Sequence, residues 1–487
     1  MGLTATSGPA FKRRPRPTGR EVRPDATIDF VLGLIEREAL HRMAAPLTTW
    51  QPGDLGRPPL FPQAMYDIFG VVSAALGSDR RAEAFFSSTI NWEPIRAALA
   101  ARYPHYRGLA PSRRTGPTRT NFWRRADKIG NDPLRLAMLD HAFTQEACDQ
   151  ARVMGLFDPE RQGYAAPDIR DYIHGDGTVL KSRFTSAPGD VYVDPETGEL
   201  IQRPHDPDAG WYKTGDKRNV YGTKFGFHHA RTGHTGEQIV LSIFQVEKSG
   251  GGGEAGAALE SLKVLLAAGL DILGVVWDMA LRGKHIDVLY SLGLISIVKV
   301  PAAPGGGPKT LNLGRHQTRG NHDATVWAID GAAHIEVFTG SDADHVRLEE
   351  PKLHRRRNKS GGFRFYAEYR IPDDPRVPPR LRGDSLTLRL HTNGDDQAAG
   401  IARSENLRPI AQGDERWDLL NAARPIAESF NAWLKSTWRN GRAPAVGKGR
   451  QHVRLIYAAM LANFTALTAF ERRTARPTGD PPLLAAA

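Results

Sequence analysis

Two aspartates in this sequence stand in strand-like segments where a carboxylate could do chemistry. Asp278 ends the apolar run ILGVVWDM, and a carboxylate at the end of a buried strand must find a cation, a helix to cap or solvent. Asp176 lies in IHGDGTVLKS, whose alternation predicts a strand. Carboxylate oxygens are the ligands that hard cations such as Mg²⁺ prefer. Two structural roles stay open: a helix N-cap for Asp278 and an Asp-Gly hairpin turn for Asp176.

A third carboxylate, Glu428, lies in a segment with helical periodicity. At about 100° per residue, four polar residues fall within one narrow arc: Arg424, Glu428, Asn431 and Lys435. The opposite side carries the apolar residues Ile426, Phe430, Trp433 and Leu434. We therefore expect one face to pack and the other to present the polar side chains together. The alternative is a surface helix in which Arg424 and Glu428 form a weak intrahelical ion pair.

Together these residues resemble the catalytic motifs of DDE transposases of the insertion-sequence type. The last motif of that family runs Tyr, two residues, Arg, three residues, Glu, six residues and Lys, and Arg424, Glu428 and Lys435 keep this spacing. Asn421 stands at the family's Tyr position, a departure that bears on any role of that Tyr in holding the DNA backbone. The resemblance includes the segments IHGDGT, YGTKFGF and VVWD, and it extends from about Asp171 to Arg473.

The resemblance implies a metal-dependent enzyme that cuts DNA and transfers the freed end. Two Mg²⁺ ions, for which Mn²⁺ can substitute, would activate the attacking oxygen and stabilise the leaving oxygen. In the implied site, Asp176 bridges both ions, Asp278 binds one and Glu428 binds the other. Water attacks first, and the freed 3′-OH then attacks target DNA. The implied partner is double-stranded DNA, at the element ends and the target, bound by a homodimer.

Two groups of residues are predicted to contact this DNA. The first is the polar face of the Glu428 helix, with Arg424, Asn431 and Lys435. The second is the segment PSRRTGPTRTNFWRRADK, in which cations surround two aromatic rings, because Arg grips phosphate through two hydrogen bonds and a ring can stack or wedge. Its predicted DNA-binding residues are Arg113, Arg114, Arg119, Trp123, Arg124 and Arg125. The alternative is a solvated loop or helix start whose rings pack below.

Apolar periodicity divides the chain into helical and strand-rich parts. Steps of three and four residues predict a helical DNA-binding domain over residues 29–165. Residues 166–302 then predict three strands, a helix, a strand, a helix and a strand. That order is expected of an α/β fold with a ribonuclease-H-like mixed-sheet core. A β-rich insertion is predicted over residues 303–412, and the core resumes over residues 413–475 with the Glu428 helix.

Composition favours a polyanionic partner. Lys and Arg number 65 against 54 Asp and Glu, a formal net charge of +11. Cys148 is the only cysteine, which excludes an intrachain disulfide and a thiolate zinc cluster. The N-terminus has no apolar core of a secretory signal, and charges interrupt the apolar stretch over residues 262–281, so neither export nor a membrane span is expected. We expect a cytoplasmic, nucleoid-associated bacterial protein with a disordered basic arm at 1–28 and a disordered tail at 476–487.

Two other functions stay open. A ribonuclease-H-like nuclease would hydrolyse DNA without strand transfer, and a catalytically inactive, element-derived protein would only bind DNA. Other catalytic patterns fit poorly. The histidines near residues 228–234 match no zinc spacing, and Pro308 interrupts a phosphate-binding loop in PGGGPKT.

Overall fold

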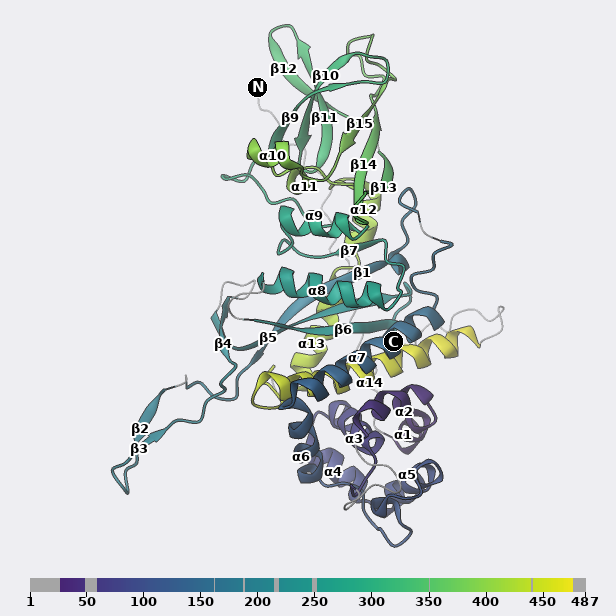
Figure 1. The fold of residues 1–487 in the computed structure, drawn as a ribbon, viewed down its shortest axis with the longest axis vertical. Helices are drawn as coiled ribbons and strands as arrows, with labels where there is room; N and C mark the ends of the chain where they lie inside the picture. Colours follow the sequence, from purple (N-terminus) through teal and green to yellow (C-terminus); the bar gives the residue numbers. More distant parts are fainter. Residues whose placement is uncertain are drawn as a thin grey trace, which may run out of the picture.

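The computed structural model describes residues 27–48, 59–161, 163–186, 189–213, 219–247, 252–349, 351–438 and 441–475. These residues form an elongated molecule with a helical region at one end, a sheet with helices in the middle and a β-rich region at the other end (Figure 1). The predicted basic arm, apart from its last two residues, and the predicted tail lie outside the described residues.

The helical region is built from amphipathic helices packed around one core. Its helices are α1 (Ile28–Ile35), α2 (Glu38–Ala44), α3 (Gln63–Leu76), α4 (Asp79–Ser87), α5 (Thr89–Arg102), α6 (Arg119–Gly130) and α7 (Pro133–Val153). Helix α6 begins inside the arginine-rich segment, because the Thr118 and Asn121 side chains form a reciprocal capping box. Asp132 caps α7, and Pro133 occupies its first turn, where a missing N–H costs nothing.

The middle layer is a mixed sheet. Its strands are β1 (Tyr172–Lys181), β4 (Gly210–Lys213), β5 (Asn219–Arg231), β6 (Gln238–Val246), β7 (Gly274–Val276) and β8 (Ile295–Ile297). Strands β6, β5, β1, β7 and β8 lie side by side in that order, and β4 pairs with the start of β5. Strand β5 runs antiparallel to β1 and β6, whereas β7 runs parallel to β1 and β8. The parallel pairs need crossovers, which α8 (Gly253–Ala267) and α9 (Gly283–Ser291) supply. The predicted α/β class, with a mixed sheet behind a helical N-terminal region, is confirmed.

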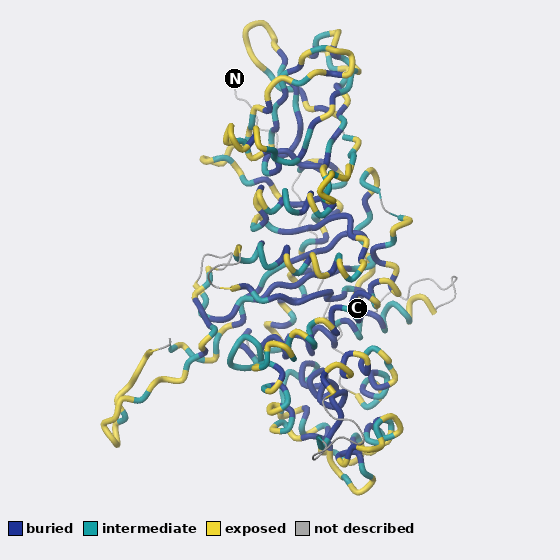
Figure 2. The backbone as a smooth tube through the Cα atoms, in the orientation of Figure 1, coloured by how far each residue is buried: buried dark blue, intermediate teal, exposed yellow. Residues whose placement is uncertain are grey.

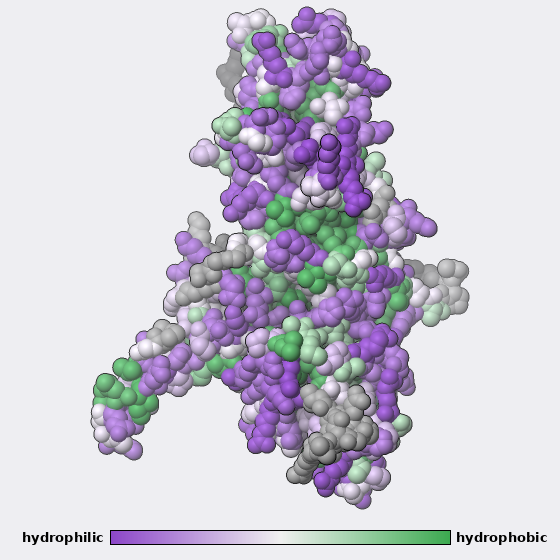
Figure 3. Space-filling model, viewed as in Figure 1, coloured by the Kyte–Doolittle hydropathy of each residue, from purple (hydrophilic) through white to green (hydrophobic). Residues whose placement is uncertain are grey.

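A hairpin of β2 (Val191–Val193) and β3 (Leu200–Gln202) extends away from the sheet between β1 and β4 (Figure 1). The sequence did not predict it, because turn-forming Asp, Gly and Pro dominate this stretch. The side chains of Val193 and Leu200 are 61% and 70% exposed, and hydrophobic colour gathers on this arm in Figure 3. Packing against the body therefore does not hold the hairpin in place.

The β-rich region contains two small sheets. They are formed by β9 (Thr310–Gln317), β10 (Asp323–Ile329), β11 (Ala332–Thr339) and β12 (Asp342–Arg347), and by β13 (Lys352–Arg357), β14 (Phe363–Arg370) and β15 (Ser385–Arg389). Short helices α10 (Gly394–Ala398), α11 (Arg403–Asn406) and α12 (Glu415–Asn421) follow. The cationic run HRRRNK lies mostly in β13, where its side chains alternate between the two faces of a strand.

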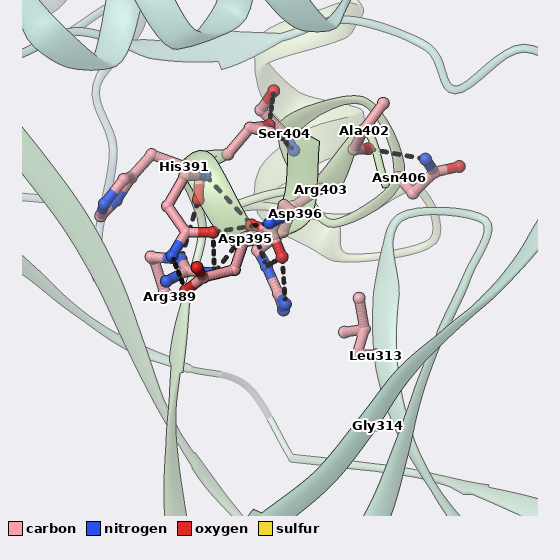
Figure 4. Close-up of polar contacts among 12 residues, drawn as sticks. Leu313, Gly314, Arg389, His391, Asp395, Asp396, Ala402, Arg403, Ser404 and Asn406 are labelled. Atoms are coloured by element: carbon pink, nitrogen blue, oxygen red, sulfur yellow. Dashed lines mark hydrogen bonds and ion pairs between the residues drawn. The ribbon is translucent and has the colours of Figure 1, made fainter. Parts of the chain in front are cut away.

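Asp396 ties the end of β15 to α10 and α11 (Figure 4). Its buried carboxylate accepts hydrogen bonds from Arg389 at 2.7 Å and from Arg403 at 2.9 Å. In the same cluster, Ser404 donates to Asp287 of α9 at 2.9 Å. Buried charges of opposite sign joined by several hydrogen bonds hold a defined geometry, so the β-rich region is fixed to the sheet layer through α9.

Two further helices return the chain to the sheet and the helical region: α13 (Pro425–Thr437) and α14 (Lys448–Thr474). Helix α14 packs against α3, α6, α7 and β6, and its apolar face completes the core of the helical region. By length and composition α14 could cross a membrane, and 67% of its most apolar window is buried inside the protein. Figure 2 shows buried residues along most of this helix. The N-terminal helices therefore share one core with the C-terminal end of the chain.

Asp67 of α3 is a buried acid inside this shared core. Its Oδ1 accepts from Tyr457 of α14 at 3.0 Å and from Gln63 at 2.7 Å, while Oδ2 has no hydrogen-bond partner among the described residues. Burial raises the pKa of Asp67 from 3.8 to about 7. Ionised Asp67 therefore costs stability at neutral pH.

Replacing Asp67 with Asn should stabilise the protein at pH 8 and leave its stability nearly unchanged at pH 4. The folded-state pKa of about 7 lies above the unfolded value near 3.8, so the cost of ionisation is absent below pH 4, grows between pH 4 and 7 and is complete above pH 7. The gain at pH 8 is at most about 4 kcal/mol. Urea unfolding at pH 4, 6 and 8 measures it. A difference between variant and wild type that does not grow with pH would contradict the role of burial.

Candidate active site

The sheet register brings Asp176 and Asp278 together. Strands β1 and β7 are parallel, with His174 beside Val276. Asp176 and Asp278 each follow these partners by two residues, Asp278 just beyond the end of β7, and the charge of Asp278 acts on Asp176. Asp176 pairs with Phe227 in the middle of the β1–β5 ladder, which excludes the hairpin-turn alternative. The Asp278 Oδ1 accepts from the Ala280 N–H at 2.8 Å and so caps a turn that precedes α9.

Glycines on both sides of Asp176 face side chains that pack closely against the strand, and at position 175 the ring of Trp277 leaves no room for a Cβ. Side chains alternate along a strand, so Asp176 faces α13 while positions 175 and 177 face α8. A Cβ at position 175 would overlap the ring of Trp277, and a Cβ at position 177 would overlap the carboxylate of Glu254. The run IHGDGT thus lets a bulky indole and a third acid approach the strand that carries Asp176.

Asp176 lies in a poorly solvated, acidic setting. Its pKa is raised from 3.8 to about 6, chiefly because burial disfavours the charged form, and the charges of Glu254 and Asp278 add to the rise. Hydrogen bonds from Asn431 and the Gly177 N–H act in the opposite direction. Glu254, in the first turn of α8, forms an ion pair with Lys224 of β5. The sequence did not single out Glu254 as a candidate site residue, although it directly follows the glycines at positions 250–253.

Asn431 joins the last helix of this site to Asp176. Its Nδ2 donates to the Asp176 Oδ2 at 2.7 Å, and the residue is 4% exposed. The Asn431 Oδ1 is buried and has no hydrogen-bond partner among the described residues. The sequence had grouped Asn431 with the polar face and a DNA contact. It instead belongs to the buried stripe of Ala427, Phe430 and Leu434, whose spacing of three and four residues was the available signal.

Glu428 lies one turn from Asn431, but its side chain is directed to solvent. It is 56% exposed and pairs with Arg424 at 3.6 Å, which is the intrahelical ion pair left open by the sequence. Lys435 is also exposed. Within the described ranges, no three His, Cys, Asp or Glu side chains are grouped so that they could hold a metal ion. The structure therefore brings together Asp176, Asp278 and Asn431 and leaves Glu428 outside that group.

The donor atoms at this site suit a hard cation. Asp176 and Asp278 supply carboxylate oxygens, and the Asn431 Oδ1 is an oxygen acceptor without a partner in the described chain. Mg²⁺ is commonly held by one or two carboxylates, with water and substrate phosphates completing its octahedron. A cation would also offset the charge repulsion that raises the pKa of Asp176. These residues fit one Mg²⁺ ion, and a second ion would need Glu428 as well, because Glu254 lies on the α8 face of the sheet and pairs with Lys224.

Several of the other predicted DNA-binding residues have partners inside the protein. Arg125 donates to the carbonyl oxygen of Leu47 at 2.6 Å and to Gln63, so its guanidinium stabilises the helical region. Arg113 donates to the carbonyl oxygen of Thr115 at 3.1 Å. The exposed Arg114 pairs with Glu93 at 3.3 Å.

The remaining three residues of that segment lie on α6. Arg124 is exposed. Trp123 donates to Asp79 at 2.6 Å, and the guanidinium of Arg119 lies 5.6 Å from the centre of its ring. Arg119 and Trp123 line one cleft, and Arg125 does not.

Comparison with known proteins gives likenesses to solved structures and no sequence relative. No protein-family model and no curated protein matches the sequence. The chain is similar to a piggyBac transposase in a synaptic complex with hairpin DNA, with a TM-score of 0.26 and 11% identity over 94% of this chain and 84% of that chain. At that TM-score the likeness establishes neither a shared fold nor a shared function.

Replacing Asp176 with Asn should stabilise the metal-free protein at pH 7.5. The folded-state pKa of about 6 exceeds 3.8, so ionised Asp176 costs roughly 1–3 kcal/mol above pH 6 and nothing below about pH 4. Asn retains an oxygen that can accept from Asn431. Chemical unfolding at pH 7.5 and pH 4 in EDTA tests this, with Asp127→Asn on α6 as a control. Equal destabilisation at both pH values would show that Asp176 has only a structural role.

Proposed function

We propose that this protein is a DNA transposase that cuts element ends and transfers the 3′-OH to target DNA with divalent metal. The observation that carries the proposal is the group formed by Asp176, Asp278 and the Asn431 Oδ1, which has no hydrogen-bond partner among the described residues. These oxygen donors suit Mg²⁺, which phosphodiester transfer needs, and a cation would offset the repulsion between the Asp176 carboxylate and its acidic neighbours. The net charge of +11 favours a polyanionic substrate.

The sheet topology supports the proposal of a ribonuclease-H-like core. Three antiparallel strands in chain order, β1, β5 and β6, are followed by two parallel strands on the other side of β1. The helix with the predicted catalytic glutamate, α13, packs across β1 and β5. Candidate acids thus come from the central strand, from the end of its parallel neighbour and from a helix packed over both.

Each residue would have a defined task in this enzyme. When bound, the metal supplies Lewis-acid activation of the attacking oxygen and stabilises the leaving oxygen. Asp176 and Asp278 hold it, while the Asn431 N–H keeps the Asp176 carboxylate oriented. Lys435 and Arg424 bind phosphate near the cut. The exposed Arg424–Glu428 pair is weak, so a phosphate that engages Arg424 releases Glu428 to complete the proposed acidic triad.

Substituting the proposed triad should abolish catalysis and retain DNA binding. Asp176→Asn, Asp278→Asn and Glu428→Gln should each lower the rate of joining a donor end to target DNA by at least about 100-fold, because each removes a proposed ligand of the metal that stabilises developing charge. The exposed Glu415→Gln on α12 is a matched control that should keep full activity. The assay uses Mg²⁺ or Mn²⁺ with labelled donor ends.

The products of that assay also distinguish the alternative functions. Joined product sensitive to all three substitutions supports a transposase. Cleavage without joining indicates a nuclease. Joining that survives Asp176→Asn would reject the site, and DNA binding without any chemistry would leave an inactive DNA-binding protein.

Replacing Asn431 should weaken metal binding before any DNA is present. Asn431→Ala removes one oxygen donor and the hydrogen bond to Asp176, and such losses typically cost 10–100-fold in metal affinity. Asn431→Asp restores an oxygen donor and should recover most of the affinity. Calorimetric titration with Mn²⁺ measures both variants, with Asn421→Ala on α12 as the control. Unchanged affinity in Asn431→Ala would exclude Asn431 from the metal site.

A further inference from the structure

A cleft of about 710 Å³ lies where the helical region meets the chain between α13 and α14. Five arginines line it: Arg80, Arg119, Arg183, Arg442 and Arg454. They come from α4, α6, the end of β1, the α13–α14 connection and α14, so residues distant in sequence converge on one cleft. We call it the arginine cleft.

The arginine cleft holds more positive charge than its own acids neutralise. Among the described residues, its only lining carboxylate is Asp79, which accepts from Arg454 at 2.9 and 2.6 Å and from Trp123 at 2.6 Å. Arg119 has a longer contact of 3.5 Å with Glu83. Like charges confined together repel unless an anion lies between them. The lining alone therefore favours an anionic ligand.

Two of these arginines are available to such a ligand. Arg80 and Arg442 are exposed, and no ion pair or side-chain hydrogen bond of either is found within the described ranges. Arg183 instead supports the wall of the cleft, since its guanidinium donates to the carbonyl oxygens of Ala443, at 2.9 Å, and Pro444. The indoles of Trp123 and Trp438 also line the cleft and offer flat apolar surface beside the cations.

The arginine cleft is attached to the strand that carries Asp176. The Lys181 N–H donates to the Gly441 carbonyl at 2.8 Å, and the Ala443 N–H donates to the Lys181 carbonyl at 2.8 Å. Lys181 follows Asp176 by five positions on β1, which is roughly 16 Å at about 3.3 Å per residue. Duplex DNA advances about 3.4 Å per base pair, so along a duplex that runs parallel to β1 this separation corresponds to about five base pairs.

A second cavity extends the basic surface toward the β2–β3 hairpin. It has a volume of about 360 Å³ and shares Arg183 with the arginine cleft. Its wall includes Tyr192, with the guanidinium of Arg203 at 5.6 Å from the ring centre. Two adjoining cavities lined by arginines and aromatic rings suit an extended polyanion better than a single small anion.

We propose that the arginine cleft binds the phosphodiester backbone of duplex DNA about five base pairs from the scissile phosphate. Arg80 and Arg442 each neutralise one phosphate, and the two indoles contact the adjoining sugars. Such contacts position DNA without reading its sequence. The location relative to the cut depends on the proposed transposase function, whereas the binding of phosphate does not.

Salt-dependent DNA binding tests the cleft without requiring catalysis. Arg80→Ala with Arg442→Ala should reduce the slope of log K against log salt by about 1.8, since each phosphate contact contributes about 0.9. The matched control combines Arg81→Ala, the neighbour of Arg80 on α4, with Arg472→Ala at the end of α14, both exposed and outside the cleft. Fluorescence anisotropy with a 30-base-pair duplex at several salt concentrations, in an Asp278→Asn background, measures the slopes. Equal slopes for cleft and control variants would overturn the proposal.

Further experiments distinguish the loss of a DNA contact from a folding defect and from the binding of another anion. If the double variant does not fold, Arg80→Gln alone should lower the slope by about 0.9, and Arg80→Lys should restore it. Tripolyphosphate is the probe for a free-anion site: displacement of it by DNA supports the proposal, and simultaneous binding of both rejects it. Phosphate ethylation should interfere with binding about five base pairs from the cut. A lower slope in the cleft variant, together with no strand transfer by the wild-type protein, would keep the cleft and reject the transposase.

Discussion

The hydrogen bond between Asn431 and Asp176 connects residues 255 positions apart and determines where α13 lies on the sheet. A buried carboxylate is unstable without donors, and Asp176 finds its side-chain donor on α13. Phe430, one residue before, packs against the rings of Phe227 and His229 on β5. Apolar packing thus supplies the contact area for α13, and the polar bond selects its rotation over β1.

Several features around Asp176 lower the stability of the folded protein. Two glycines weaken the central strand so that Trp277 and Glu254 can approach it. His174 and His229, paired across β1 and β5, are buried, and burial lowers their pKa to about 4 and about 3. They are neutral at physiological pH and do not offset the negative charge of Asp176. Buried groups with strongly shifted pKa values lower the stability of the fold, and they are characteristic of functional sites, where charge is arranged for a ligand.

Strand β1 connects the residues around Asp176 to the rest of the molecule. One edge pairs with β5 and the other with β7, and its end hydrogen-bonds to the α13–α14 connection. From there α14 passes into the helical region and shares its core. The acidic group and the arginine cleft are therefore held at a defined separation by one extended strand, which is stiffer than a loop.

By itself, the sequence determined the features that depend on short-range periodicity. Alternation around Asp176 predicted its strand, the apolar run before Asp278 predicted a buried strand end, and helical spacing predicted α13 with Glu428 on the polar face opposite its packed residues. Only the tertiary structure decided which residues meet: it turned Asn431 inward, brought Glu254 beside Gly177 and gathered the arginines of the cleft. The physical reason is the distance along the chain over which each kind of interaction acts. Backbone geometry repeats every two or 3.6 residues, whereas contacts across hundreds of residues depend on how whole elements pack.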